Sequence, residues 1–98
     1  MEKANILVVD DDKEIAELVG IHLREEGYEV YKAYSGKEAL EIFKQERIDL
    51  VILDVMMPVM DGNQVCSKIR DTSAVPIIML SAHKAWKQRP DLQALPTP

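Results

Sequence analysis

The strongest constraint on the fold is an apolar run that leads directly into a carboxylate. Residues Leu50–Leu53 are all apolar, Asp54 follows at once, and Pro58 and Gly62 come within the next eight positions. A short apolar run bounded by turn residues is typical of a strand buried on both faces, as in parallel sheets. Asp54 would then lie at the carboxyl end of the strand, where open α/β sheets bind ligands. An isolated Asp there is often only a loop cap, so its meaning depends on further carboxylates nearby.

A second apolar run also ends in carboxylates. Ile6–Val9 is followed by Asp10–Asp12, and a helical spacing begins directly afterwards. One Asp is enough to cap a helix, and adjacent carboxylates repel one another, so capping does not account for the whole run. A calcium-binding EF-hand loop is excluded, because its required Gly and Glu positions hold Ile15 and Ile21.

The rest of the chain alternates between helical and strand patterns. Helices are expected from Lys13, from a capping box at Ser35–Glu38, and from Gly62 to about Asp71. A more exposed strand near an edge is expected at Tyr28–Ala33, and a fourth strand at Pro76–Leu80. On the first helix one apolar face holds Ile15, Leu18, Val19, His22 and Leu23, with His22 expected as a packed or boundary residue. This alternation predicts right-handed crossovers and an α/β fold, a doubly wound parallel sheet with helices on both faces.

Right-handed crossovers place the carboxyl ends of all parallel strands at one edge of the sheet. Asp10, Asp11, Asp54 and Ser81 should therefore meet in one cleft. Two like charges about 4 Å apart repel by roughly 4 kcal/mol at an effective dielectric near 20, so the cleft favours a dication. Carboxylates and a hydroxyl suit Mg²⁺, and a carboxylate beside the ion can attack phosphorus in line.

Three motifs now identify a family resemblance. They are Val8–Asp11 after the first strand, Leu53–Gly62 after the third and Leu80–Ala82 after the fourth. In this order they resemble the receiver domain of bacterial two-component response regulators, over residues 4 to 82. The resemblance implies a flavodoxin-like receiver fold with strand order 2-1-3-4, lacking the fifth strand and fifth helix of a complete receiver.

The resemblance also implies how a metal site would be built. Asp54 would be the phosphoacceptor, and Asp11 and Asp54 would ligate Mg²⁺ directly. Asp10 would act on the ion through water, and the backbone carbonyl of Met56 would complete the protein ligands.

Further roles follow by the same resemblance. Ser81 would be the switch hydroxyl that turns to bond the phosphoryl group, and Ala82 the small residue that keeps the pocket accessible. Pro58, Asp61 and Gly62 would shape the loop before the third helix. The phosphodonor would be a phosphohistidine on a sensor histidine kinase, and the chain would act as a phosphoacceptor signalling domain rather than an enzyme with an external substrate.

The sequence changes character after the last motif. Residues 1–82 are expected to form a partial receiver domain with a formal charge of -7, whereas residues 83–98 carry +2 and three of the five prolines. This tail is expected to be poorly ordered or to form a short helix. Lys84 and Lys87 follow no apolar strand run, so neither is expected to replace the Lys that a receiver carries on its fifth strand. Phosphoryl transfer is therefore expected to be impaired.

Composition narrows the possible partners and location. A net charge of -5 disfavours nucleic acid as a partner of this segment, and the apolar runs are too short for a membrane span. The single cysteine, Cys66, favours a reducing cytoplasm.

Two other function classes were weighed against the receiver. A phosphatase of the haloacid-dehalogenase type would need a second Asp two positions after Asp54, where this chain has Met56. A receiver remnant that no longer switches and acts as an oligomerising interaction module remains open. In either case the truncated side is expected to leave the strand edge at 77–80 and part of the stripe of Ile15, Leu18 and Val19 uncovered. A homodimer or a larger homo-oligomer through that side is therefore expected, and the competing outcome is a monomer whose Pro-rich tail folds back over the gap.

Overall fold

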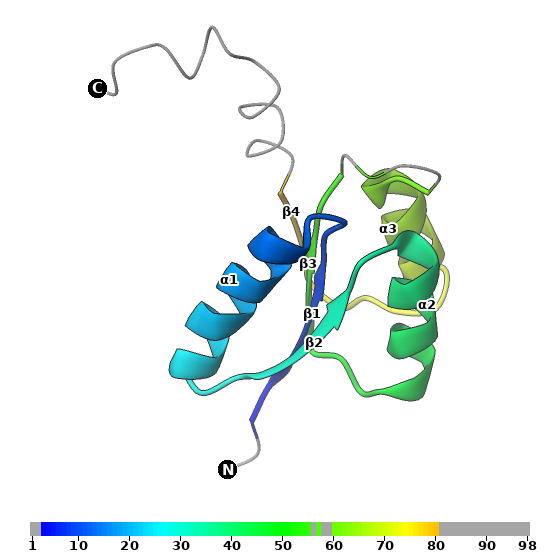
Figure 1. The fold of residues 1–98 in the computed structure, drawn as a ribbon. Helices are drawn as coiled ribbons and strands as arrows, with labels where there is room; N and C mark the ends of the chain where they lie inside the picture. Colours follow the sequence, from blue (N-terminus) through cyan, green and yellow to red (C-terminus); the bar gives the residue numbers. More distant parts are fainter. Residues whose placement is uncertain (1–2, 56, 58–59, 81–98) are drawn as a thin grey trace, which may run out of the picture.

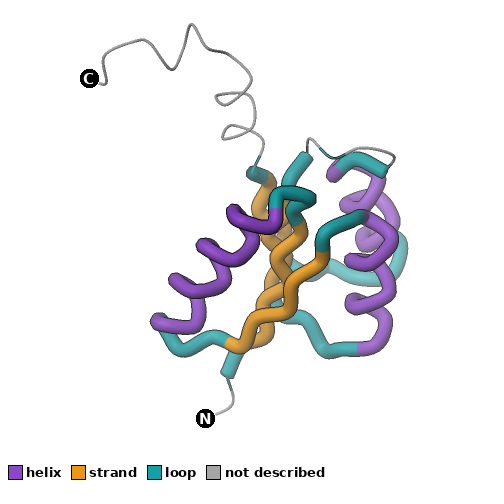
Figure 2. Tube along the Cα trace, in the orientation of Figure 1, coloured by secondary structure: helices purple, strands orange, loops and turns teal. Residues whose placement is uncertain are grey.

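The computed structural model describes residues 3–55, 57 and 60–80 of the chain, and it confirms the doubly wound α/β architecture (Figure 1). Within this part the strands form one parallel sheet in the order β2-β1-β3-β4. The helix α1 covers one face of the sheet and α2 and α3 cover the other, as Figure 2 also shows. The elements in chain order are β1 (Asn5–Val9), α1 (Lys13–Glu25), β2 (Glu29–Ala33), α2 (Gly36–Gln45), β3 (Leu50–Leu53), α3 (Gly62–Arg70) and β4 (Ile77–Met79).

The central strands β1 and β3 are buried because alternate side chains serve two cores. Leu7 and Val9 of β1 pack in the core beneath α2 and α3, with Val51 and Leu53 of β3. The intervening residues of both strands face α1, whose Ala16 is fully buried there. This period of two follows from the pleat of a strand, and it explains why residues Ile6–Val9 of β1 and Leu50–Leu53 of β3 are all apolar.

The first helix packs through smaller residues than its apolar stripe predicts. Ala16 and Gly20 are its buried residues, whereas Leu18 is 54% exposed and His22 is exposed. The expectation that His22 is a packed or boundary residue is therefore wrong, whereas the exposure of Leu18 agrees with the expectation that part of the stripe lacks cover. The small side chains allow α1 to lie close to β2, where a Cβ on Gly20 would meet Val30 at an ordinary contact distance of 3.6 Å.

The helices begin at side-chain caps that the sequence predicts. Asp12 Oδ1 accepts hydrogen bonds from the backbone N–H groups of Glu14 and Ile15 at the start of α1. At α2, Ser35 Oγ accepts from Glu38 N at 3.1 Å, and Glu38 Oε1 accepts from Tyr34 N at 2.8 Å. In a standard capping box Glu38 would accept from the N–H of the cap residue Ser35, but here it accepts from the N–H of the preceding residue, Tyr34. Both donors are still satisfied, so the capping arrangement fixes where each helix begins.

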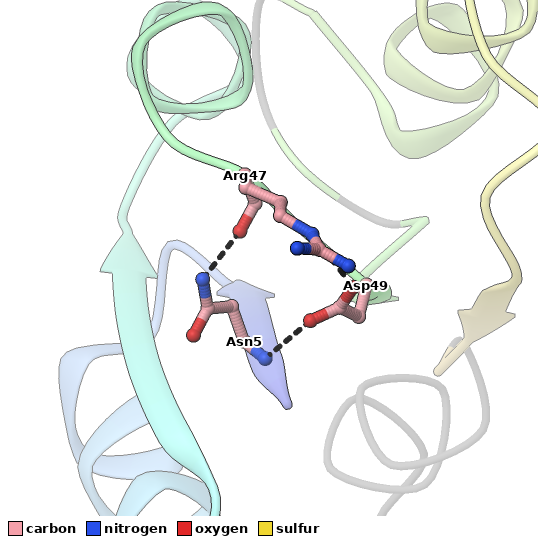
Figure 3. Close-up of polar contacts among 3 residues, drawn as sticks. All are labelled: Asn5, Arg47 and Asp49. Carbon is pink, nitrogen blue, oxygen red and sulfur yellow. Dashed lines mark hydrogen bonds and ion pairs between the residues drawn. The ribbon is translucent and has the colours of Figure 1, made fainter. Parts of the chain in front are cut away.

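The amino edge of the sheet is held by a small polar network (Figure 3). Asn5 N donates to Asp49 Oδ2 at 2.8 Å, and Asn5 Nδ2 donates to the carbonyl oxygen of Arg47 at 2.6 Å. Arg47 Nε lies 3.6 Å from Asp49 Oδ1. The network joins the start of β1 to the connection between α2 and β3.

No helix in the described part of the chain has the length and apolar character needed to cross a membrane.

Candidate metal and phosphoacceptor site

The site begins with two carboxylates that directly follow neighbouring strands. Asp54 N donates to the carbonyl oxygen of Val9 at 2.9 Å, and Asp10 N donates to that of Ala33 at 3.0 Å. These bonds continue the ladders one residue past β3 and β1, so both Asp residues stay in register with the sheet. Asp54 is 0% exposed and Asp10 is 2% exposed. Burial of two acidic residues at one edge is costly unless the charge is compensated.

The structure brings Asp11 to the same place. Asp10, Asp11 and Asp54 each offer a carboxylate oxygen, and these oxygens all lie within 4.8 Å of one another. We call these three residues the acidic cluster. Asp11 is partly exposed, so the cluster is open to solvent on one side. Asp10 Oδ1 also accepts from Asp12 N at 2.9 Å, which fixes the orientation of that carboxylate.

The acidic cluster has the ligand chemistry of a magnesium site. Mg²⁺ takes oxygen ligands at about 2.0–2.1 Å and keeps several waters, so two oxygens on one ion are at most ~4.2 Å apart. The observed limit of 4.8 Å requires only a small contraction, or one carboxylate acting through a water. Ca²⁺ needs six to eight oxygen ligands, more than the cluster provides. The donor set therefore fits Mg²⁺.

Gly62 fixes the backbone behind Asp54. A Cβ on Gly62 would lie 2.5 Å from the carbonyl oxygen of Asp54 and 2.6 Å from Val55 Cα. Real contacts are not that short, so only glycine lets α3 begin this close to the end of β3. Gly62 N donates to Val55 O at 3.0 Å, and the preceding Asp61 caps α3 by accepting from Gln64 N at 3.0 Å. Asp61 and Gly62 thus hold the strand end that carries Asp54.

Four other residues of the expected site, Met56, Pro58, Ser81 and Ala82, lie outside the described residues. The chain can be followed to the position before Ser81, where Leu80 N donates to Leu53 O at 2.7 Å. Leu53 is the residue before Asp54. The pairing of β4 therefore continues to the level at which the acidic cluster begins.

Charged groups near the site are arranged by contacts that the sequence analysis did not predict. Lys13 Nζ lies 5.4 Å from the centroid of the Tyr34 ring, a cation–π contact between the starts of α1 and α2. On α1, Glu17 forms an ion pair with Lys32 of β2. The hydrogen bond from Lys32 and its positive charge hold the pKa of Glu17 below its usual value. On the opposite face of β2, at the neighbouring residue, burial and the charge of Glu46 raise the pKa of Tyr31.

Comparison with known proteins identifies the family. The profile of the family described as "Response regulator receiver domain" matches residues 6–94. This chain belongs to that family. The resemblance drawn from the three motifs is thereby confirmed. The match continues past residue 82, into the part of the chain outside the described residues, and the division at residue 82 stays a prediction.

Relatives of this receiver domain include regulators with solved structures. The regulatory protein VanR of Enterococcus faecium is 53% identical over 76 residues, which are 78% of this chain and 33% of VanR. The chain thus spans about a third of that relative. The response regulator TrrA of Thermotoga maritima, solved in complex with Mg²⁺ and BeF, is 43% identical with a TM-score of 0.78; the match covers 87% of this chain and 75% of TrrA.

A second structure contains TrrA together with a kinase. The complex of the histidine kinase ThkA with TrrA matches at 46% identity and a TM-score of 0.76. The match covers 81% of this chain and 69% of the matched chain.

Proposed function

We propose that Asp54 of this receiver domain accepts a phosphoryl group from a sensor histidine kinase in a reaction that depends on Mg²⁺. The observation that carries the proposal is the acidic cluster, whose oxygens lie within 4.8 Å of one another at the carboxyl edge of the sheet. TrrA, the relative with a bound Mg²⁺ and BeF, and its complex with the kinase ThkA support the metal and the partner.

The residues of the chain divide the chemistry among them. A carboxylate oxygen of Asp54 attacks phosphorus, a new O–P bond forms, and the N–P bond of the donor breaks while the imidazole nitrogen keeps the electron pair. The acidic cluster would hold the ion, Asp11 and Asp54 directly and Asp10 through a water. A bound Mg²⁺ would neutralise the phosphoryl oxygens as charge develops. Gly62 and the Asp61 cap keep Asp54 from shifting during the attack.

The remaining assignments belong to the same proposal. The backbone carbonyl of Met56 completes the metal ligands, and Pro58 shapes the loop that follows. Ser81 bonds the phosphoryl group after transfer, and Ala82 leaves room for it. The domain promotes only its own phosphorylation and dephosphorylation, so it is a signalling domain rather than an enzyme that turns over an external substrate.

The proposed cellular location and partners rest on a relative, on Cys66 and on the net charge. We propose a cytoplasmic domain of a transcription regulator, in line with its relative, the regulatory protein VanR, and with the free thiol of Cys66. The acidic net charge of -5 makes a direct contact of this segment with nucleic acid unfavourable.

Mass spectrometry after incubation with phosphoramidate and Mg²⁺ tests the proposal. The wild type should gain one phosphoryl group, and Asp54→Asn should gain none. Asp71→Asn, which removes an exposed carboxylate at the end of α3, is the matched control and should react like the wild type. Modification of Asp54→Asn, or no modification of the wild type, would refute the proposed function. Slow, incomplete modification would agree with the expected impairment.

A second candidate function is self-association through the β4 edge. In the described part of the chain, Ile78 and Met79 of β4 are 49% and 39% exposed. Apolar residues on an outer strand can pair with a second chain. Sedimentation at micromolar concentration tests this candidate, and a monomer at all concentrations would refute it.

A further inference from the structure

A pocket with a volume of about 340 Å³ lies between the ends of α2 and α3, which run side by side on one face of the sheet (Figure 1). Every residue that lines it belongs to the described part of the chain. Gly62, which packs behind Asp54, begins α3, whereas the pocket lies where α3 ends. At ~1.5 Å per residue, the 9 residues of α3 separate the two places by ~13 Å. The pocket is therefore distinct from the acidic cluster.

The floor of the pocket is apolar. Leu40 and Phe43 of α2 are partly buried against the core, and Ile69 of α3 is buried within it. Residues three positions apart share one face of a helix, so Leu40 and Phe43 form one continuous apolar surface. An apolar cavity of about 150 Å³ already holds a benzene ring, and pockets for small molecules begin at roughly 300 Å³. The pocket therefore has room for one ring or branched side chain and for the polar atoms attached to it.

The rim of the pocket carries charges of both signs. Lys44 lies on the lining face of α2, and Lys68, Asp71 and Thr72 share one face at the end of α3. All four side chains are exposed. Within the part of the chain that the structure describes, neither lysine forms an ion pair with Asp71. Two ammonium groups and one carboxylate are therefore available to a ligand.

The turn that ends α3 holds this side of the rim in place. Thr72 N and Ser73 N both donate to the carbonyl oxygen of Ile69, at 3.1 and 2.9 Å. Thr72 Oγ1 also donates to that oxygen, at 3.5 Å, so its own lone pairs are directed elsewhere. Arg70 Nη1 donates to the Ser73 carbonyl oxygen at 3.2 Å. A backbone fixed in this way positions Asp71 and Thr72 before a ligand arrives, which reduces the entropy lost on binding.

We propose that this pocket binds a free α-amino acid with a large apolar side chain. The apolar side chain lies on Leu40, Phe43 and Ile69. The α-carboxylate is bound by the ammonium groups of Lys44 and Lys68.

The α-ammonium group donates to the Asp71 carboxylate and to Thr72 Oγ1. A simple carboxylic acid would set a like charge against Asp71, and a simple amine would set one against both lysines. A zwitterion whose two charges and side chain meet at one carbon matches the rim and the floor together. The inference goes beyond the proposed phosphoacceptor function and does not depend on it.

Binding is tested by NMR titration with L-phenylalanine of protein that carries labelled leucine and isoleucine methyl groups. The methyl signals of Leu40 and Ile69 should shift, whereas those of Leu18, exposed on α1, should stay in place. Two analogues each lack one charge: 3-phenylpropanoate has no ammonium group, and L-phenylalaninamide has no carboxylate. Each should bind about fivefold more weakly than L-phenylalanine. Signals of Leu40 and Ile69 that do not respond to millimolar L-phenylalanine, or an analogue that binds as tightly, would overturn the inference.

Variants assign the two charges of the ligand to the rim. Lys68→Gln should weaken L-phenylalanine about fivefold and leave L-phenylalaninamide unchanged, because only the first has a carboxylate to lose. Asp71→Asn should weaken L-phenylalanine and L-phenylalaninamide alike without weakening 3-phenylpropanoate. Lys37→Gln is the matched control, since Lys37 is exposed at the start of α2 and lines no part of this pocket. All three positions are exposed, so the variants should fold. Variants that bind all three compounds as the wild type does would overturn the site, while phosphorylation of Asp54 would be unaffected.

Discussion

Acidic residues occupy both edges of this sheet, but the two edges treat them differently. At the amino edge, Asp49 accepts a hydrogen bond from Asn5 N and lies beside the Arg47 guanidinium (Figure 3). At the carboxyl edge, the acidic cluster places three carboxylates within 4.8 Å of one another, two of them buried. At the amino edge, the contacts of Asp49 link β1 to the segment before β3 and so stabilise the fold. The carboxyl edge gathers three carboxylates that suit a dication, which is why we propose it as the functional edge.

The largest expected effect concerns the backbone behind Asp54. Gly62→Ala should destabilise the domain by about 3 kcal/mol, because its Cβ meets backbone atoms that cannot move without shifting β3. The control is Gly27→Ala at the turn before β2, where a Cβ meets nothing within 4 Å and only the φ of +93° is unfavourable. That change should cost about 1 kcal/mol. Urea unfolding measures both, and equal losses would show that the close approach at Gly62 is unimportant.

Neutralising one carboxylate of the acidic cluster should increase the stability of the domain, in contrast to the loss expected at Gly62. Asp11→Asn should raise the free energy of unfolding by about 1–2 kcal/mol in EDTA, because like charges a few ångströms apart repel. Added Mg²⁺ should stabilise the wild type, by about 1.4 kcal/mol at ten times its Kd, and the variant much less. A variant that is less stable than the wild type without Mg²⁺ would contradict the charge accumulation inferred for this edge.

Removing the Asp49 carboxylate at the amino edge should destabilise the domain both with and without Mg²⁺. Asp49→Ala removes the side-chain acceptor of Asn5 N and one ion-pair partner of Arg47, at a cost of about 1–2 kcal/mol. The cost should be independent of Mg²⁺, since Asp49 precedes β3 whereas the acidic cluster lies after the ends of β1 and β3. Thermal unfolding with and without Mg²⁺ provides the measurement. A Mg²⁺-dependent loss would show that the two edges are coupled.

The smallest expected effect is a pH dependence from the pair between α1 and β2. Lys32 lowers the pKa of Glu17 from its usual value of 4.5. A lowered folded-state pKa contributes stability above the unfolded value, and this contribution is lost as the pH falls through the folded value. Glu17→Gln should therefore make stability fall less steeply as the pH drops below about 4.5. Identical slopes for variant and wild type would show that the exposed pair contributes nothing.

The convergence of the acidic cluster could be predicted because it depends on strand direction alone. Two fully apolar runs require burial on both faces, and helices between the strands make them parallel. Asp10 and Asp54 directly follow such runs, so they had to reach the same edge. The packing of α1 could not be predicted in this way. An apolar stripe shows which side chains could be covered, but it does not show that Ala16 and Gly20 are the residues through which α1 packs on the sheet.

The sequence by itself determined the order and direction of the elements, the caps at Asp12, Ser35 and Asp61, and the edge where Asp10, Asp11 and Asp54 meet. These features follow from local periodicity and from the short reach of a capping side chain. Only the tertiary structure decided that Asp49 accepts a hydrogen bond from Asn5 and how closely Gly62 approaches Asp54. It also decided that Gly36 and Met60 line a pocket together with Asp11. Those contacts join residues that are far apart in the chain, and their distances are set by how whole helices seat on the sheet, which no local pattern encodes.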